Sequence, residues 1–213
     1  MKRLLTLFAL LALTLSACGA QAAPAMYIEP AKLTEEEESI AKLLGADTDQ
    51  FLLDVVLDST VRSFHVRYYD LDDGGQWHVF SESRMALDGS GTKGRMAFTY
   101  GDLSKGTREA VQFGKGVSAV SHTPPPEEDA GNSMSCGSSR LSERREVVYE
   151  EEIPLVLQVV TSKNGTVLYD VDHFFQPEAY EDLGYEHVYA LTITFSQRSL
   201  GELEGEPEFS RQD

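Results

Sequence analysis

The sequence predicts a mostly β protein, built as a single antiparallel β-sandwich of about eight to ten strands with one short helix before them. Short segments in which apolar and polar residues alternate recur at roughly the 8 to 12 residue spacing of such folds. Two turn sequences, Asp72-Asp73-Gly74-Gly75 and Asn164-Gly165, separate pairs of these segments. One segment near the start has instead the spacing of an amphipathic helix.

The helix is expected over residues 35–44. Thr34 is followed three residues later by Glu37, a spacing typical of the capping box that begins a helix. The next apolar residues lie three and four positions apart, as on one helix face: Ile40, Leu43 and Leu44. Gly45 then suits the left-handed cap that ends many helices.

A β-hairpin is expected after a first strand over residues 51–57. Its strands cover residues 61–69 and 76–83, and a two-residue loop of Asp73 and Gly74 would join them. This loop places Tyr68 opposite Val79, Tyr69 opposite His78 and Arg67 opposite Phe80. One face of the hairpin would then be apolar and buried, with these residues on it: Phe64, Val66, Tyr68, Trp77 and Val79.

The other face of this hairpin is the candidate binding surface. It would bring together Arg67, Tyr69, His78 and Phe80, an aromatic and basic patch on an otherwise acidic chain. Exposed aromatic residues clustered in this way bind sugar rings, peptides or partner proteins. The alternative is that the helix or a second sheet covers this face, so that the aromatic residues belong to the core.

Alternation also predicts the following strands, which contain residues 96–100, 111–113 and 117–121. Residues 122–143 hold three consecutive prolines, several acids and a Gly/Ser cluster, so we expect a long, exposed, mobile loop there. A short strand over residues 147–149 follows this loop.

Residues 153–160 are apolar at nearly every position, which indicates a central strand buried on both faces. Asn164-Gly165 predicts a hairpin turn with a return strand over residues 166–169. An irregular stretch over residues 170–186 leads to the last strand, whose inward residues alternate along it: Tyr189, Leu191, Ile193 and Phe195.

The first residues carry a separate signal, because Lys2 and Arg3 precede an apolar run over residues 4–15. This pattern is typical of a secretory signal peptide, and the run is too short to span a membrane. It ends in Leu15-Ser16-Ala17-Cys18, which resembles the lipobox of bacterial lipoproteins at all four positions. The resemblance implies cleavage before Cys18, lipidation of its thiol, and a cell-membrane anchor facing the extracellular or periplasmic side.

Four parts are therefore expected along the chain. Residues 1–17 form the signal peptide, and residues 18–33 form the lipidated cysteine and a spacer. The sandwich domain covers residues 34–199, and an acidic, disordered tail covers residues 200–213. The lipobox resemblance covers only the first 18 residues, and the sequence of the domain itself resembles no family that we can name.

The charge of the chain excludes some partners. Without the signal peptide, 16 Lys and Arg stand against 35 Asp and Glu, a formal balance of −19. Such a field repels nucleic acid, and it opposes a domain that lies flat on anionic lipid. Cationic partners and divalent ions are compatible with this negative charge. With Cys18 lipidated, Cys136 is alone, so we expect no internal disulfide and an ordinary loop thiol.

No metal, cofactor or catalytic site is predicted. The acidic turn at residues 70–75 could suggest a calcium site. Position 12 of an EF-type loop would be Ser81 instead of Glu, however, and strands instead of helices flank the turn. A second acidic cluster lies in the irregular stretch before the last strand, and a solvated loop explains it: Asp170, Asp172, His173, Glu178, Glu181 and Asp182. The chain has no nucleophile elbow, zinc-protease or phosphate-loop motif, and its five histidines are scattered.

These observations favour a non-enzymatic envelope lipoprotein whose β domain binds a protein or carbohydrate ligand. One alternative is an envelope hydrolase or transferase whose site forms only in three dimensions. Another is an accessory lipoprotein of a neighbouring transporter or signalling system. The oligomeric state and the identity of the ligand stay open.

Overall fold

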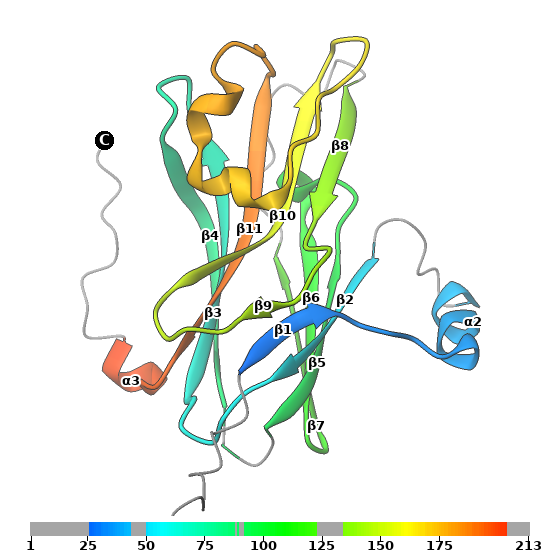
Figure 1. The fold of residues 1–213 in the computed structure, drawn as a ribbon, viewed down its shortest axis with the longest axis vertical. Coiled ribbons are helices and arrows are strands. Elements are labelled where there is room, and N and C mark those ends of the chain that lie inside the picture. The colour runs from blue at the N-terminus through cyan, green and yellow to red at the C-terminus, as the bar shows by residue number, and fades with distance from the viewer. Residues whose placement is uncertain (1–25, 44–49, 88, 90–91, 123–133, 204–213) are drawn as a thin grey trace, which may run out of the picture.

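The computed structural model describes residues 26–43, 50–87, 89, 92–122 and 134–203 (Figure 1). These residues form eleven strands in two antiparallel sheets, which confirms the predicted mostly β sandwich. Sheet A has six strands in the order β7-β6-β5-β2-β1-β9, and sheet B has five in the order β4-β3-β11-β10-β8.

Sheet A contains these strands: β1 Tyr27–Pro30, β2 Gln50–Val56, β5 Lys93–Thr99, β6 Thr107–Phe113, β7 Gly116–His122 and β9 Arg145–Glu146. Sheet B contains these: β3 Ser63–Leu71, β4 Trp77–Ala86, β8 Ser135–Arg140, β10 Glu152–Thr161 and β11 His187–Ser196. The strands expected around residues 51–57, 96–100, 111–113 and 117–121 are therefore confirmed.

The main core lies between the two sheets. Alternate residues of β2 are buried there, as period-2 alternation requires, and β1 adds Ile28, which has no exposed surface. From sheet B, the buried residues of β11 are those the alternation predicted: Tyr189, Leu191, Ile193 and Phe195. Because β1 belongs to this core, the segment expected to be a spacer already joins the domain at Tyr27.

The central strand of sheet B is also as predicted, because β10 pairs with β11 on one side and with β8 on the other. It is buried on both faces, since short 3₁₀ helices cover the outer face of sheet B. These are η3 (Val171–Phe175) and η4 (Pro177–Tyr180), which appear in gold in front of β10 and β11 in Figure 1. A second core forms beneath them from Tyr69, Phe174 and their neighbours.

The β3–β4 hairpin forms, but its predicted register is wrong. Asp72 and Gln76 close the turn by a backbone hydrogen bond of 3.0 Å, so three residues form the loop and Gly75 adopts a φ of 73°. A β-bulge then interrupts the pairing between Tyr68 and Tyr69. Tyr69 therefore pairs with Val79 instead of His78, and the two faces of β4 are exchanged.

Two other local predictions are wrong. Part of the expected loop over residues 122–143 is the edge strand β8, whose Gly- and Ser-rich backbone pairs along β10. Residues 166–169 form no strand after Asn164-Gly165, because β8 and β11 already occupy both edges of β10. Residues 147–149 likewise lie just after β9, and Tyr149 makes only an isolated bridge to Phe195.

The helix α2 occupies Glu35–Leu43, within one residue of the expected range. Its capping box is formed, because the backbone N–H of Glu37 donates to Thr34 and that of Thr34 donates to the Glu37 carboxylate. None of its residues is buried, so α2 projects from sheet A. A four-residue helix, α3 (Leu200–Leu203), ends the described part.

Cys18 and most of the expected acidic tail lie outside the described residues. No helix among the described residues is long and apolar enough to cross a membrane.

A carboxylate is buried inside the main core. Glu109 on β6 has no exposed surface and accepts hydrogen bonds from the hydroxyls of Tyr68, at 2.6 Å, and Ser83, at 2.7 Å. The Thr107 hydroxyl donates in turn to the Tyr68 oxygen. These bonds tie β6 of sheet A to β3 and β4 of sheet B across the core.

Candidate functional site

An aromatic cluster lies on the outer face of sheet B. Trp77 on β4 stacks on Phe174 of η3, with ring centroids 5.2 Å apart, and its indole N–H donates to the Phe174 carbonyl at 2.8 Å. Tyr69 on β3 packs edge-on against both rings. The cluster therefore fixes η3 on the sheet through both apolar contact and a hydrogen bond.

Large apolar side chains are exposed around this cluster. Within the described residues eight are exposed, and four of them lie on this side of sheet B: Val79, Val167, Leu168 and Phe175. Phe175 is 59% exposed although its ring contacts the buried ring of Phe174. We call the surface formed by η3, η4, residues 165–169 and Val79 the outer layer. It holds half of the exposed large apolar side chains of the described residues, spread from β4 to the edge beside β8, and exposed apolar surface of this kind marks binding surfaces.

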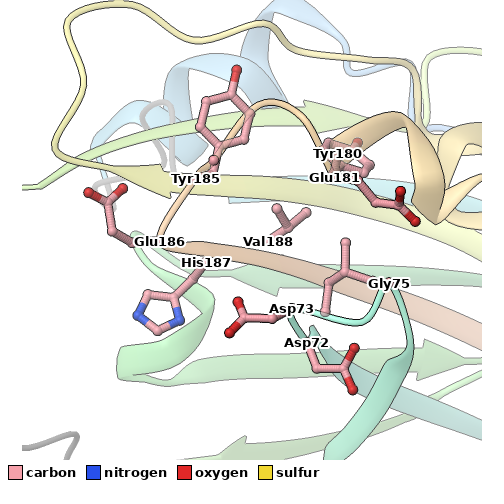
Figure 2. A pocket seen from close by; sticks show the side chains of 11 residues that line it. Asp72, Asp73, Gly75, Tyr180, Glu181, Tyr185, Glu186, His187 and Val188 are labelled. Atoms are coloured by element: carbon pink, nitrogen blue, oxygen red, sulfur yellow. The ribbon is translucent and has the colours of Figure 1, made fainter.

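A small pocket adjoins the outer layer at the end of sheet B where β3 turns into β4. Its volume is about 110 Å³, and the turn, η4, the following loop and the start of β11 line it. Figure 2 shows its lining, which includes four carboxylates, two tyrosines and a histidine: Asp72, Asp73, Glu181, Glu186, Tyr180, Tyr185 and His187.

Two of these carboxylates have structural roles. The backbone N–H groups of Gly74 and Gln76 donate to Asp72, which also contacts His78 at 2.6 Å. The bond from Gln76 is the main reason that the pKa of Asp72 is lowered. The bonds from Ser162 to Glu186 lower the pKa of that carboxyl to about 2.

The other two carboxylates are available to a ligand. The side-chain carboxylates of Asp73 and Glu181 make no hydrogen bond or ion pair with the residues that the structure describes. The pocket therefore presents free negative charge beside tyrosine rings, a combination that suits an ammonium or guanidinium group.

A polar network occupies the other half of this face. Arg67 on β3 lies 3.8 Å from Glu82 and 3.6 Å from Glu152, and the Tyr69 hydroxyl donates to Glu152. Burial alone would raise the pKa of Glu82, but the nearby ring of His65, the hydrogen bonds from Arg84 and the charge of Arg67 lower it to about 2. Most of these side chains pair with one another and form a polar cover for the sheet, although neither ring nitrogen of the buried His65 has a hydrogen-bond partner.

The four residues of the predicted binding face are not brought together. Arg67 and Tyr69 lie on the outer face of sheet B, but Tyr69 is only 8% exposed. Phe80 points the opposite way and packs on Tyr68 and Tyr189 in the main core. His78 is exposed at the turn beside Asp72. The three-residue loop and the bulge cause this exchange, and they bring Trp77 and Val79 outward instead.

Three residues of the second acidic cluster, Asp170, Asp172 and His173, have structural roles. Asp170 caps η3 by accepting from the Asp172 backbone N–H, and Asp172 pairs with Arg145 at 2.6 Å. His173 stacks on Tyr169. No group of three His, Cys, Asp or Glu side chains in the described residues has the geometry to hold a metal ion.

Cys136 lies on the edge strand β8 and not in a loop. Partial burial and the charge of Asp102 raise the pKa of its thiol, which opposes formation of the nucleophilic thiolate.

Phe174 and Phe175 are the surface residues that sequence reasoning missed. They fall in a stretch without periodicity, where the pair of phenylalanines before Pro177 was the only signal. The β3 side of the hairpin was predicted correctly, but the partners across it depended on the loop length. Comparisons of the chain with protein-family models, with curated proteins and with solved structures find no match.

Proposed function

We propose that this chain is a lipid-anchored protein of the bacterial envelope whose β-sandwich is a non-enzymatic binding module. Its ligand is a protein segment that carries apolar and basic side chains. The observation that supports this most is the outer layer, which exposes Phe175 and Val79 and, at Tyr180 of η4, meets a pocket that holds the carboxylates of Asp73 and Glu181. Apolar contact would provide affinity, and the carboxylates would select for lysine or arginine.

The position of this surface fits an anchored binding module. The chain enters β1 at Tyr27, which pairs with Val56, and six residues then connect β2 to the start of β3 at Ser63. The pocket lies at the other end of β3, beside Asp72. In Figure 1 the β3–β4 turn and the start of β1 are accordingly at opposite ends of the sandwich. A tether to the membrane would leave the pocket on the far side.

The tether would be short. Seven residues separate Cys18 from Met26, the first described residue, and the eight steps from one to the other span at most about 29 Å in a fully extended chain. Two acyl chains on Cys18 would give stable anchoring, because each buried CH₂ contributes about 0.8 kcal/mol. The domain would thus work close to the membrane surface.

The anchor is tested by growing cells that express the full chain with an alkyne fatty acid and measuring label on the protein. The chain has two cysteines, so Cys136→Ala is the matched control for Cys18→Ala. We expect label on the wild type and on Cys136→Ala and none on Cys18→Ala. Equal label on both variants would show that Cys18 is not the lipidation site.

The ligand class is tested by panning a random peptide library displayed on phage against the purified protein. We expect enriched peptides to combine Lys or Arg with an aromatic or aliphatic residue. Their affinity, measured by calorimetry with synthetic peptides, should fall at least about tenfold in Phe175→Ser, because the exposed ring supplies apolar contact area. Val117→Ser changes an equally exposed apolar residue on β7 and should leave binding intact. Equal loss in both variants would contradict the assignment.

A further inference from the structure

The strand β4 forms one edge of sheet B, and the described part of the chain places no other strand along its outer side. Among the described residues β3 is the only strand that pairs with β4. The short helix α3 contacts β4 at the end away from the pocket, because it follows Ser196 of β11, which lies level with Ser63 and Ala86. Figure 1 accordingly shows α3 and the β3–β4 turn at opposite ends of the strand. An edge of this kind presents N–H and C=O groups with which another chain can pair.

The hydrogen bonds of the hairpin show which backbone groups face this free edge. The Asp72 N–H donates to the Gln76 carbonyl, so the backbone groups of Gln76 point toward β3. Because these groups alternate in direction along an antiparallel strand, those of Trp77 and Val79 point away from β3. Phe80 is the extra residue of the bulge and interrupts the alternation. Next to the turn, the free edge of β4 is therefore formed by Trp77 and Val79.

The side chains of Trp77 and Val79 connect this free edge to the outer layer. Both lie on the outer face of sheet B, where Trp77 stacks on Phe174 of η3 and Val79 is 43% exposed. A strand that paired with these two residues would place its own directly opposed side chains on the same face. Every second side chain of that strand would thus extend the apolar surface of the outer layer.

The charge at this end of β4 is negative. Four carboxylates line the pocket beside the turn, and no lysine or arginine lines it among the described residues. Lys163 lies outside the lining, over the ring of Tyr185, and its ammonium donates to a backbone carbonyl. His78 pairs with Asp72, which leaves most of the negative charge without a partner cation. A segment that carries lysine or arginine is therefore attracted to this end of the strand.

The other edge of sheet B lacks this charge. The strand β8 carries Arg140 and no acid, and the nearby Asp102 pairs with Lys105. Both β4 and β8 expose an edge in the described part of the chain, but only the edge of β4 adjoins uncompensated carboxylates. Charge therefore directs a basic segment to β4.

From these observations we propose that the protein ligand binds as an extended strand along the free edge of β4, with a lysine or arginine in the pocket at the turn. The inference rests on the proposed function and adds to it how the ligand is held. Main-chain hydrogen bonds to Trp77 and Val79 provide affinity for an extended segment. Its outer-face side chains and the basic side chain in the pocket then select the sequence.

Amide hydrogen exchange measured by NMR tests the strand pairing. The probe is the synthetic peptide of highest affinity from the panning, added at a saturating concentration to the purified protein. We expect the amides of Trp77 and Val79 to exchange at least about tenfold more slowly with the peptide, because pairing removes them from water. The outward amides of β8 are the internal control and should not change. These are Cys136 and Ser138, because the Leu141 N–H donates to β10 and the direction alternates from there.

Methylation of the peptide's backbone nitrogens, one at a time, tests the pairing from the ligand side. In a paired strand every second N–H points to β4. Methylation of these groups should weaken binding at least about fivefold, since it removes a hydrogen bond, whereas methylation of the groups between them should change binding less than about twofold. Calorimetry measures each affinity.

Proline at the free edge of β4 removes a donor but keeps an apolar side chain. Val79→Pro deletes an N–H that points away from β3, and proline is tolerated at such positions of edge strands. We expect it to weaken peptide binding at least about fivefold, while Cys136→Pro, the same change on the β8 edge, leaves binding unchanged. Thermal unfolding shows whether each variant folds. If Val79→Pro does not fold, the exchange and methylation data decide alone.

Binding without slower exchange at Trp77 and Val79 would overturn the pairing, as would slower exchange at the β8 edge. A methylation pattern without a period of two would do the same, because an added strand cannot produce it. These results would leave the proposed function standing, since the peptide would still bind. A panning that enriches no basic and apolar peptide would instead remove the proposed function, and the pairing with it.

Discussion

Removing the hydroxyl of Tyr68 tests how the two sheets are held together. Tyr68 is only 1% exposed, and its hydroxyl donates a hydrogen bond to the buried Glu109 carboxylate and accepts one from the Thr107 hydroxyl. Tyr68→Phe keeps the ring and deletes both hydrogen bonds. It leaves a buried carboxylate with one fewer donor and a buried threonine hydroxyl without its acceptor.

The expected cost is large for a single atom. A hydrogen bond to a charged group contributes about 1.5 to 3 kcal/mol, and an orphaned buried hydroxyl costs about 1 kcal/mol more. We therefore expect Tyr68→Phe to lower the free energy of unfolding by about 3 kcal/mol. With an m-value of roughly 2 kcal/mol/M, the urea midpoint would move down by about 1.5 M.

Tyr149→Phe is the matched control. Its hydroxyl bonds Asp58 and Thr60 at the partly exposed edge of the domain, where water replaces the lost partner, so the cost should stay below about 1 kcal/mol. Urea unfolding followed by circular dichroism measures both. If Tyr68→Phe costs no more than Tyr149→Phe, the bonds to Glu109 do not stabilise the sandwich as argued.

Three further predictions concern other parts of the fold. Phe174→Ala should destabilise the domain by about 3 kcal/mol because Phe174 is buried, whereas Phe175→Ala should cost below about 1 kcal/mol; thermal unfolding of the two variants distinguishes them, and equal costs would contradict the packing of η3. The pKa of Glu82 is lowered from 4.5 to about 2, so its contribution to stability is present above pH 4.5 and is lost as the pH falls toward 2; Glu82→Gln should flatten the decline of the melting temperature in that window, and an unchanged decline would refute the role of the network. Thr34→Ala should speed amide exchange in α2 severalfold without lowering the melting temperature, because α2 buries no residue; a clear drop in melting temperature would show that α2 supports the core.

Most strands could be predicted from the sequence, because each shows either alternating apolar and polar residues or a continuous apolar run. β2, β5 and β6 alternate in burial, and β11 alternates apolar and polar residues along its sequence. β10 and β11 are both buried on both faces, since 3₁₀ helices cover the outer side of sheet B. β8 could not be found in this way, because its Gly and Ser residues carry no alternation and only its backbone pairing with β10 makes it a strand. The same holds for β1, which lies within the segment predicted to be a spacer.

The binding surface was harder to predict because it depends on one loop. An extra loop residue and one bulge turn Trp77 outward and Phe80 inward, and neither feature has a strong sequence signal. The aromatic partner of Trp77 lies almost a hundred residues later in an irregular stretch, so only the folded chain brings Phe174 and Phe175 to it. The pocket acids come from separate loops for the same reason.

The binding role of the outer layer is tested most directly by site-specific photo-crosslinking in living cells. A benzophenone amino acid replaces Phe175 on the outer layer in one strain and Val117 on the far side of the sandwich in another; both positions are exposed. The proposed function predicts a discrete crosslinked protein from position 175, lost when Asp73 and Glu181 are both changed to their amides, and no such product from position 117. The same products from both positions, or none from position 175, would contradict it.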